Sequence, residues 1–525
     1  MEKIKYGREA RESVQKGVDA LANAVKITLG PKGQTVMIDR GGEEEPIITK
    51  DGVTVAKNIT VEDRHEKMGA DLIRSVAKQA EQGSGDGTTT ATVLTQAILK
   101  EGLQLVTAGY DANELKQGIL FAARQAGDYI SSVAIPVCHS DKMIKQVATV
   151  SANNDEAIGE IVGEAFGKVG EEGGVSVEEA RGPDTTISVV DGVHFDRGMV
   201  SPYFSTNPNK MEVSLKDPYI MFVDGKCKVV EDVMPTLEQV VQAGRSLLII
   251  AEDIEGQALA TLVMNKTRGG AAVCAVKTPG FGNQRAEILK DMAAQTGGMV
   301  CKAEDLININ GSYLGQADIA TISQGGTVIV GAKGDKELIQ DRVTLIQDEK
   351  KREKSEFNKK QLDNRIAKLS GGIAVIYVGG NSEVEMKEKM DRVIDAKEAV
   401  ISALEEGVVA GGGLTLFRAK QHIHGHSNDT IQRGIDIVKR ALESPMKTIC
   451  ENAGTSGDVV CDKVYDLNRD IDSKVDFVGY DAKEGEYVNM FQRGIMDPAK
   501  VTRVALANAA SVASTILTTG CAIKL

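Results

Sequence analysis

The chain has 525 residues, of which 42% are hydrophobic and 26% charged, and its formal net charge is −13 at pH 7. This length predicts two to four domains, because a single hydrophobic core rarely grows beyond about 250–300 residues. The acidic balance argues against a general nucleic-acid binder, and the absence of any apolar run of about eighteen residues argues against a membrane span. The N-terminal residues include no apolar signal core, so we expect a cytoplasmic protein.

Seven cysteines are scattered along the chain without a C-x-x-C pair, at positions 138, 227, 274, 301, 450, 461 and 521. This pattern favours buried free thiols in a reducing compartment over a zinc site or a disulfide framework. Tryptophan is absent and aromatic residues make up only 4% of the chain, so aliphatic side chains must fill the cores. Many of the 55 glycines stand where helical patterns stop, which predicts elements joined by tight turns.

The first part of the chain contains helical patterns and short strand patterns. Residues 8–28 predict a long helix, because apolar residues recur at spacings of three and four, at Val14, Val18, Leu21 and Val25. A glycine-proline turn at residues 30–33 ends it. The other elements expected here are strands at 35–39 and 47–49 and helices at 64–82 and 89–107.

The middle of the chain has a different character. Between about residues 187 and 330, β-rich runs alternate with helical segments, which predicts an α/β layer domain. Strands are expected at 246–251 and 272–277, and helices at 232–243, 256–267 and 283–296.

Charged and helical patterns dominate the rest. Residues 335–369 are a strongly charged helical stretch, whose basic residues at 350–352 and 354 are interleaved with acids. A solvated helix face explains this stretch better than a nucleic-acid patch does. Residues 429–520 are again mostly helical, so the two ends share a character that the middle lacks. This predicts one domain built from both ends, with the other domains inserted.

The most informative segment is Gly85-Asp86-Gly87-Thr88-Thr89-Thr90, which lies where one predicted helix ends and the next begins. Glycines let backbone amides approach an anion, and a helix N-terminus adds orphan donors and a favourable dipole. Asp86 is placed to hold Mg²⁺, which prefers a carboxylate together with phosphate oxygens. The alternative is an ordinary N-capped turn, which three consecutive threonines weaken. The glycine turns at 28–33 and 411–413 fit the same site, although a helix end explains either, and no P-loop motif is present.

An ordered set of motifs resembles the group I (GroEL-like) chaperonins over essentially the whole chain. The motifs lie at residues 28–33, 49–53, 85–90, 151–153, 195–198, 201–204, 406–413 and 497–498. The resemblance implies a mainly α fold with α/β insertions in three domains. The helical equatorial ATPase domain would comprise 1–133 and 407–525, the intermediate domain 134–190 and 373–406, and the apical domain 191–372.

The same resemblance implies an ATP site in the equatorial domain. Its expected nucleotide-binding residues are Thr28, Leu29, Gly30, Pro31, Lys50, Asp86, Gly87, Thr88, Thr89, Thr90, Gly412, Asp481, Ala482, Ile495 and Asp497. Asp86 would bind Mg²⁺, and the backbone carbonyl of Thr28 would help bind K⁺. Asp395 matches the family's catalytic aspartate, and Asp51 matches a second carboxylate beside the γ-phosphate. Asp395 would approach the nucleotide when the intermediate domain closes about hinges at Pro136, Gly407, Gly192 and Gly372.

Helices 232–243 and 256–267 carry apolar residues over a wider arc than one core-facing stripe requires. Two deeply buried helices are the alternative, and composition alone favours it. By resemblance, these helices line a groove that binds unfolded client proteins and a GroES-like co-chaperonin lid. The matching contacts are Met199, Tyr203, Phe204, Met234, Leu237, Leu259, Val263 and Met264, and the methionines suit a promiscuous binder.

Three features depart from the family pattern or stand outside it. The segment 452–454 is followed by Thr455-Ser456 in place of the two glutamates usual at the contact between rings. With Lys447 nearby, an ion pair between the rings is expected to be lost. A double sevenfold ring is still expected, with a weaker contact between its two rings. The Gly-Met-rich tail is absent from the sequence. His422, His424 and His426 are interpreted as a solvent loop in preference to a metal cluster. The expected function is an ATP-dependent chaperone without nucleic-acid or membrane partners; the alternatives are a chaperonin paralogue acting as a scaffold or restricted chaperone, and a small-molecule kinase.

Overall fold

The computed structural model describes residues 4–39, 46–137, 140–170, 173–180, 182–207, 211–268, 270–280, 282–303, 306, 311–353, 355–469 and 475–524. The chain forms two compact units. The first combines Met1–Gly163 with Ser382–Leu525, and the second is Glu164–Asn381. The segments expected to form an intermediate domain are therefore divided between the two units. In the part of the chain described, no helix is both long and apolar enough to cross a membrane.

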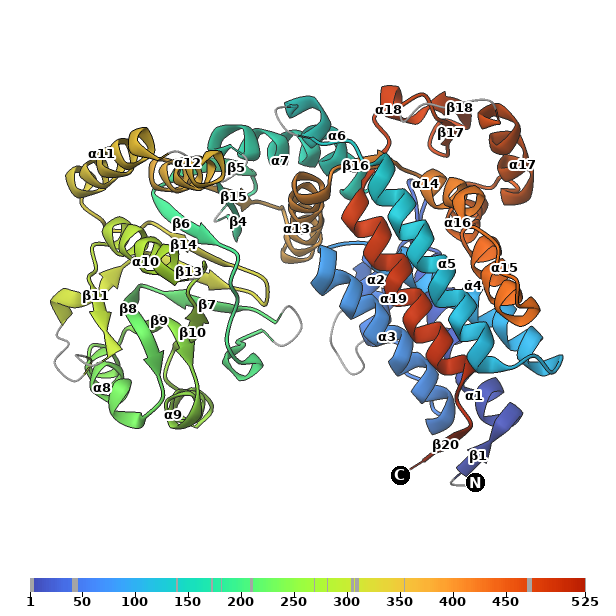
Figure 1. Ribbon diagram of the computed structural model, residues 1–525, viewed down its shortest axis with the longest axis horizontal. Helices are drawn as coiled ribbons and strands as arrows, with labels where there is room; N and C mark the ends of the chain where they lie inside the picture. The colour runs from blue at the N-terminus through green and yellow to red at the C-terminus, as the bar shows by residue number, and fades with distance from the viewer. Residues whose placement is uncertain are drawn as a thin grey trace. The chain divides into compact units, whose positions relative to one another are not determined.

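Long antiparallel helices build the first unit, and α5 and α19 run side by side in Figure 1. Its principal helices are α1 (Gly7–Lys26), α3 (Arg64–Ser84), α4 (Thr88–Thr107), α5 (Ala112–Val133), α15 (Asp429–Ala441) and α19 (Ala499–Leu517). The apolar stripe of α1, which includes Val18 and Leu21, is fully buried, as its spacing predicts. The helices expected at 8–28, 64–82 and 89–107 are thus confirmed, with bounds that differ by one or two residues.

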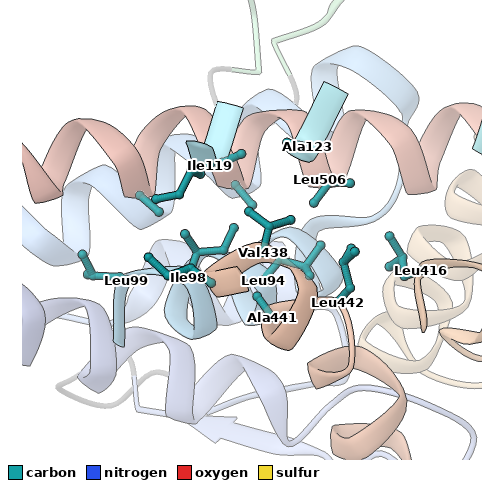
Figure 2. Close-up of a cluster of buried hydrophobic side chains, with 14 of the residues drawn as sticks. Leu94, Ile98, Leu99, Ile119, Ala123, Leu416, Val438, Ala441, Leu442 and Leu506 are labelled. Atoms are coloured by element: carbon teal, nitrogen blue, oxygen red, sulfur yellow. The ribbon is translucent and has the colours of Figure 1, made fainter. Parts of the chain in front are cut away.

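Aliphatic side chains fill the core between these helices (Figure 2). Ile98 of α4, Ile119 of α5, Val438 of α15 and Leu506 of α19 are all fully buried in it. Helices α5 and α15 approach especially closely, because a Cβ on Gly118 would lie 2.1 Å from the carbonyl oxygen of Ile431. Glycine is therefore required for this helix crossing.

Shorter elements complete the first unit. The helices are α2 (Gly52–Asn58), α6 (Asp141–Ser151), α13 (Glu383–Glu406), α14 (Leu414–Ala419), α16 (Ser444–Asn452), α17 (Gly457–Asn468) and α18 (Met490–Arg493), and α7 (Glu156–Val169) continues into the second unit. Four antiparallel strand pairs join β1 (Ile4–Tyr6) to β20 (Cys521–Ile523), β2 (Val36–Ile38) to β3 (Ile47–Thr49), β16 (Val408–Ala410) to β19 (Met496–Pro498), and β17 (Val478–Asp481) to β18 (Glu486–Asn489). The predicted strands near 35–39 and 47–49 are β2 and β3.

The second unit contains the predicted α/β layer (Figure 1). Its parallel strands stand in the order β10 (Val273–Lys277), β9 (Ser246–Ile254), β8 (Pro218–Cys227) and β11 (Val300–Lys302), with β12 (Gly315–Gln316) antiparallel to β8. Helices α8 (Met234–Gln242), α9 (Gly256–Thr267) and α10 (Gly282–Thr296) connect the parallel strands. A second sheet contains β6 (Gly192–Phe195), β14 (Thr327–Val330), β13 (Ile319–Ile322) and β7 (Val213–Lys216), and a third contains β4 (Gly174–Glu179), β15 (Ile373–Val378) and β5 (Thr186–Val190).

The charged helical stretch predicted at 335–369 consists of two helices, α11 (Lys336–Arg352) and α12 (Glu356–Ser370). The chain turns at Glu353, and the hydroxyl of Ser355 caps α12 by accepting a hydrogen bond from the Asn358 amide at 3.4 Å. The turn lets the two helices bury a shared apolar cluster of Val343, Ile346, Leu362 and Leu369. One straight helix would leave that stripe in solvent, and the helical character predicted for 335–369 is confirmed.

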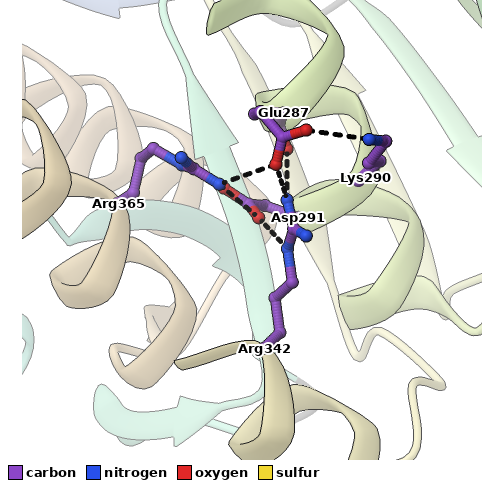
Figure 3. Close-up of polar contacts among 5 residues, drawn as sticks. All are labelled: Glu287, Lys290, Asp291, Arg342 and Arg365. Carbon is purple, nitrogen blue, oxygen red and sulfur yellow. Dashed lines mark hydrogen bonds and ion pairs between the residues drawn. The ribbon is translucent and has the colours of Figure 1, made fainter. Parts of the chain in front are cut away.

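A charged cluster fastens this helix pair to α10 (Figure 3). The carboxylate of Asp291, which is only 6% exposed, accepts hydrogen bonds at 2.7 Å from Nε of Arg342 on α11 and from Nε of Arg365 on α12. Glu287 pairs with both arginines and with Lys290. Because a buried charge that loses its partner is strongly destabilising, the cluster fixes three helices relative to one another.

The six cysteines within the described residues are free, and five of them are buried. Burial raises the pKa of the Cys227 and Cys274 thiols to about 12, so both are unreactive at neutral pH. Cys138 lies outside the described residues.

Candidate functional site

The first unit contains a cavity of about 730 Å³. Every residue that the sequence analysis assigned to nucleotide, metal or catalysis lines it. They are Thr28, Leu29, Gly30, Pro31, Lys50, Asp51, Asp86, Gly87, Thr88, Thr89, Thr90, Asp395, Gly412, Asp481, Ala482, Ile495 and Asp497. These residues come from segments spread over 470 positions of sequence, and the fold brings them to one place.

The N-terminus of α4 forms one wall of the cavity. Gly87 precedes the helix with φ +86°, and no side chain caps the first turn. A Cβ on Gly87 would lie 2.7 Å from Val501, so the position requires glycine for space as well as for conformation. Uncapped amides of a first helical turn are the donors that an anion such as phosphate uses. The structure therefore lacks the ordinary N-capped turn that was the alternative for this segment.

Asp86 stands directly before this helix N-terminus. Its Oδ1 accepts a hydrogen bond from the Gly87 amide at 2.5 Å, and its Oδ2 accepts one from the hydroxyl of Ser151 at 2.9 Å. Burial raises the pKa of Asp86, and the charge of Asp51 raises it further.

Two more carboxylates approach Asp86. Asp395, on α13, has a pKa raised well above its usual range by burial and then by the charges of Asp51 and Asp86. Asp51 caps α2 through hydrogen bonds to its carboxylate from the amides of Val53 and Thr54, at 3.0 and 2.8 Å, and from the Thr54 hydroxyl at 2.7 Å. This cap is a structural role that the sequence analysis did not assign to Asp51.

The surplus of negative charge fits a divalent cation. Asp51, Asp86 and Asp395 repel one another, while Arg392, a basic residue of the lining, is already paired with Asp155 at 2.8 Å and with a glutamate of its own helix. Mg²⁺ takes one or two protein carboxylates together with phosphate oxygens. A cation held by Asp86 next to the uncapped helix would reduce the repulsion among the carboxylates and would lie close to the bound phosphate.

For K⁺, the Thr28 side chain is already engaged, since its hydroxyl donates to the carbonyl oxygen of Val25 at 2.9 Å. The backbone carbonyl of Thr28 therefore stays the expected ligand.

The glycine turn before α14 and the loop between β17 and β18 also line the cavity. Gly412 has φ +64°, in the left-handed region that favours glycine. Asp481 organises the loop by accepting from the Lys483 amide at 3.0 Å and pairing with Arg493 at 2.9 Å. Burial, with a smaller contribution from the charge of Asp86, raises the pKa of Asp497 to about 7.

This shift makes the stability of the nucleotide-free protein depend on pH. A carboxyl whose pKa is raised in the folded state binds its proton more tightly there, so the free energy of unfolding falls as the pH rises from about 4 to about 7. We expect Asp497→Asn to be more stable than the wild type at pH 8, and this advantage to shrink towards pH 5. Urea unfolding in EDTA across this range measures the effect, for which each pKa unit corresponds to about 1.4 kcal/mol.

The exposed Asp466→Asn, on α17 away from the cavity, is the matched control and should follow the wild type at every pH. A constant difference between Asp497→Asn and the wild type across the pH range would contradict the assignment.

Several lining residues had no role assigned from sequence. Ser151 and Asn153 belong to a motif that contributed only to the resemblance, and Ile449 and Tyr480 gave no signal. Asn153 and Asn154 both adopt positive φ, at 57° and 62°, which is uncommon outside glycine. Such strain in a cavity wall is a recurrent property of functional sites, but it is visible only in the structure.

The predicted client-binding residues in the second unit differ in exposure. Tyr203 is 69% exposed and Met264 is 52% exposed. Four more are partly buried against the core, namely Met199, Met234, Leu259 and Val263. Phe204 and Leu237 are buried, at 0% and 3% exposure, so the expectation that they lie in an open groove is wrong.

The correction has a simple cause. Leu237 lies on the side of α8 that packs into the main apolar core of the second unit, and Phe204 is enclosed in the same core. The alternative of two deeply buried helices fails as well, since Val241 of α8 and Met264 of α9 are each about half exposed, at 51% and 52%.

Lys447 forms ion pairs within the chain, with Glu443 at 2.9 Å and Asp458 at 2.7 Å. Its charge is thus engaged beside the segment expected to contact a second ring. In the histidine loop, His422 stacks on Tyr129 with ring centroids 4.1 Å apart, and His426 accepts a hydrogen bond from the Asn428 amide at 3.1 Å. No group of three or more potential metal ligands is arranged to hold an ion anywhere in the described residues.

The chain combines a helical body built from both of its ends, a cavity that contains an uncapped helix N-terminus and clustered carboxylates, and an α/β insertion. The chain belongs to the TCP-1/cpn60 chaperonin family, whose model matches residues 21–525. This confirms both the chaperonin resemblance and the predicted fold class.

A solved structure of the same fold is the chaperonin gp146 from the bacteriophage EL 2 (Pseudomonas aeruginosa), crystallised in the presence of ATP-BeFx. It is 22% identical, each chain covers 99% of the other, and the TM-score is 0.71 for crystal form II. Crystal form I of the same protein, again at 22% identity and 99% coverage, gives a TM-score of 0.63. At this identity the likeness concerns the fold.

Proposed function

We propose that this chaperonin binds and hydrolyses MgATP in the cavity of the first unit and uses the cycle to bind, enclose and release non-native proteins. The observation that carries the proposal is the cavity itself. The uncapped N-terminus of α4 lines the same cavity as three mutually repelling carboxylates, which is an arrangement suited to phosphate and a divalent cation together. The gp146 crystals, grown in the presence of ATP-BeFx, add support from a protein of the same fold.

Each part of the cavity has a role in this proposal. The amides of Thr88, Thr89 and Thr90 hold the phosphates, and Asp86 holds Mg²⁺, which would neutralise charge on the phosphates. Asp395 orients the attacking water and accepts its proton. Asp51 is the second carboxylate beside the γ-phosphate, and its hydrogen bonds to the first turn of α2 hold it in place.

Client binding is proposed for the exposed side of α8 and α9. Met264 of α9 and Tyr203, on the short turn Pro202–Phe204, are the most exposed of the predicted residues, and the partly buried Leu259 and Val263 extend the surface. Flexible methionine side chains adapt to varied apolar surfaces. A GroES-like lid would compete for this same surface. The cytoplasmic location is a separate prediction from the sequence.

Ring assembly is proposed from two open sheets of the first unit. The pairs β1–β20 and β2–β3 each have only two strands within the described residues, so each presents unpaired edges. Large apolar side chains are exposed on both pairs: Tyr6 (67%), Ile523 (52%), Met37 (69%) and Ile48 (47%). Edges of this kind are templates for pairing with another chain, here a second copy. Sevenfold symmetry and a stack of two rings are also proposals. The ion pairs of Lys447 within the chain argue against the second ring, because they already engage its charge.

We expect Met37→Glu to convert the assembly largely to monomers, because the substitution places a charge on the β2 edge. Sedimentation velocity measures the masses. Leu338→Glu, at a 60% exposed position on α11, is the matched control and should leave the assembly intact. Equal masses for Met37→Glu and the wild type would contradict the proposal that β2 forms part of the interface between subunits.

One experiment tests the whole function. Steady-state ATP hydrolysis is measured together with refolding of a denatured enzyme, with and without a co-chaperonin lid. We expect Mg²⁺-dependent hydrolysis and ATP-dependent recovery of the client. Hydrolysis without recovery would favour the scaffold or restricted-chaperone alternative, and absence of nucleotide binding would overturn the proposal.

A further inference from the structure

We propose that Ser151 is a positioning residue of this site, which fixes the Asp86 carboxylate for the cation and ties it to the helix that carries Asp395. The inference rests on the proposed ATPase function and deepens it.

The hydroxyl of Ser151 contacts two segments that are distant from it in sequence. Ser151 is the last residue of α6, and its Oγ lies 2.9 Å from Oδ2 of Asp86, which is 65 positions away. The same Oγ lies 3.2 Å from the backbone oxygen of Asp395, which is 244 positions away on α13. One side chain therefore touches both the proposed cation ligand and the segment of the proposed base.

A serine hydroxyl has a single hydrogen to donate, so the two acceptors share it. The shorter contact is to the carboxylate, where hydrogen bonds to a charged group are the stronger ones. The other carboxylate oxygen, Oδ1, accepts from the Gly87 amide at 2.5 Å. Each oxygen thus has one donor, which fixes the plane of the carboxylate and still leaves lone pairs for a cation. A ligand that is already oriented loses less freedom when the cation binds.

Helix α13 has other contacts with the turn that contains Asp86. The hydroxyl of Ser402, which is only 2% exposed, donates to the backbone oxygen of Ser84 at 2.8 Å. Glu398 packs on Gly85 so closely that a Cβ there would lie 2.3 Å from the Cβ of Glu398. These contacts hold the helix against the turn without reaching the carboxylate. Ser402 therefore offers a matched control that separates helix docking from carboxylate orientation.

The test measures the affinity for ADP as a function of Mg²⁺ concentration, because ADP is not hydrolysed. We expect Ser151→Ala to raise the Mg²⁺ concentration for half-maximal ADP affinity about tenfold or more, as loss of a hydrogen bond to a charged group implies. ADP affinity in EDTA should stay unchanged. Ser151→Thr keeps the hydroxyl and should restore the wild-type Mg²⁺ requirement, whereas Ser402→Ala should not change it.

Two results would overturn the role of Ser151 alone. One is an unchanged Mg²⁺ requirement in Ser151→Ala, and the other is an equal shift in Ser402→Ala, which would indicate a merely structural effect. Should Ser151→Ala fail to fold, Ser151→Cys, whose thiol is a weaker donor, decides by the same measurement. Failure of the wild type to bind ADP in Mg²⁺ would instead overturn the proposed function, and this role with it.

Discussion

Replacing Asp395 by alanine is expected to slow ATP hydrolysis by about 100- to 10,000-fold, the usual contribution of a general base, while leaving MgATP affinity close to that of the wild type. The physical reason is that Asp395 acts on the attacking water, whereas the phosphates are held by the first turn of α4. Removing it also relieves repulsion with Asp51 and Asp86, so nucleotide affinity should be equal or higher. Single-turnover kinetics and equilibrium titration with MgATP measure the two quantities separately.

Glu385→Ala, at an exposed position on the same helix, is the control and should retain wild-type turnover. A parallel loss of affinity and rate in Asp395→Ala would show that this carboxylate binds the nucleotide complex and is not the base.

The second large effect concerns the two helices of the proposed client surface. Leu237→Ser is expected to destabilise the second unit by about 2–5 kcal/mol, because it leaves a void and a hydroxyl in the core. Met264→Ser, at a position 52% exposed, should leave stability within about 0.5 kcal/mol of the wild type and weaken client binding instead. Urea unfolding gives the stability, and capture of a denatured protein by the nucleotide-free chaperonin gives the binding.

The two variants form a matched pair on neighbouring helices. Normal stability of Leu237→Ser would contradict its burial. Undiminished client capture by Met264→Ser would instead remove Met264 from the proposed surface and direct attention to Tyr203.

Long helices and the residues of the cavity were predictable from sequence for different reasons. The helices of the first unit have a strong period, as Val14, Val18 and Leu21 show, and their burial follows from it. Asp86 and the threonines at 88–90 were indicated by local chemistry, whereas the other cavity residues were named only through an ordered set of motifs, since glycine turns at 28–33 and 411–413 are each explained by a helix end. Their assembly into one cavity depends on long-range packing that no local pattern contains.

Errors arose where a local pattern leaves the packing side undetermined. Helix α8 is apolar on more than one side, so sequence could not tell that Leu237 faces the core while Val241 faces solvent. The helical character of 335–369 was predictable, but the break at Glu353 was not, because it has neither glycine nor proline. The cap at Asp51 was predictable in principle, since aspartate is among the residues preferred at a helix N-cap.

The pairing of β1 with β20 determines when, during synthesis, the protein can finish folding. The first strand leaves the ribosome before almost everything else, and its partner is made about five hundred residues later. Helices α1 to α5 must likewise wait for α15 and α19 to close their shared core. The second unit is continuous in sequence and is complete while this core still lacks α19, an interval of roughly 7–30 s at about 5–20 residues per second. During that time, the half-built helical core exposes the kind of apolar surface that chaperones bind.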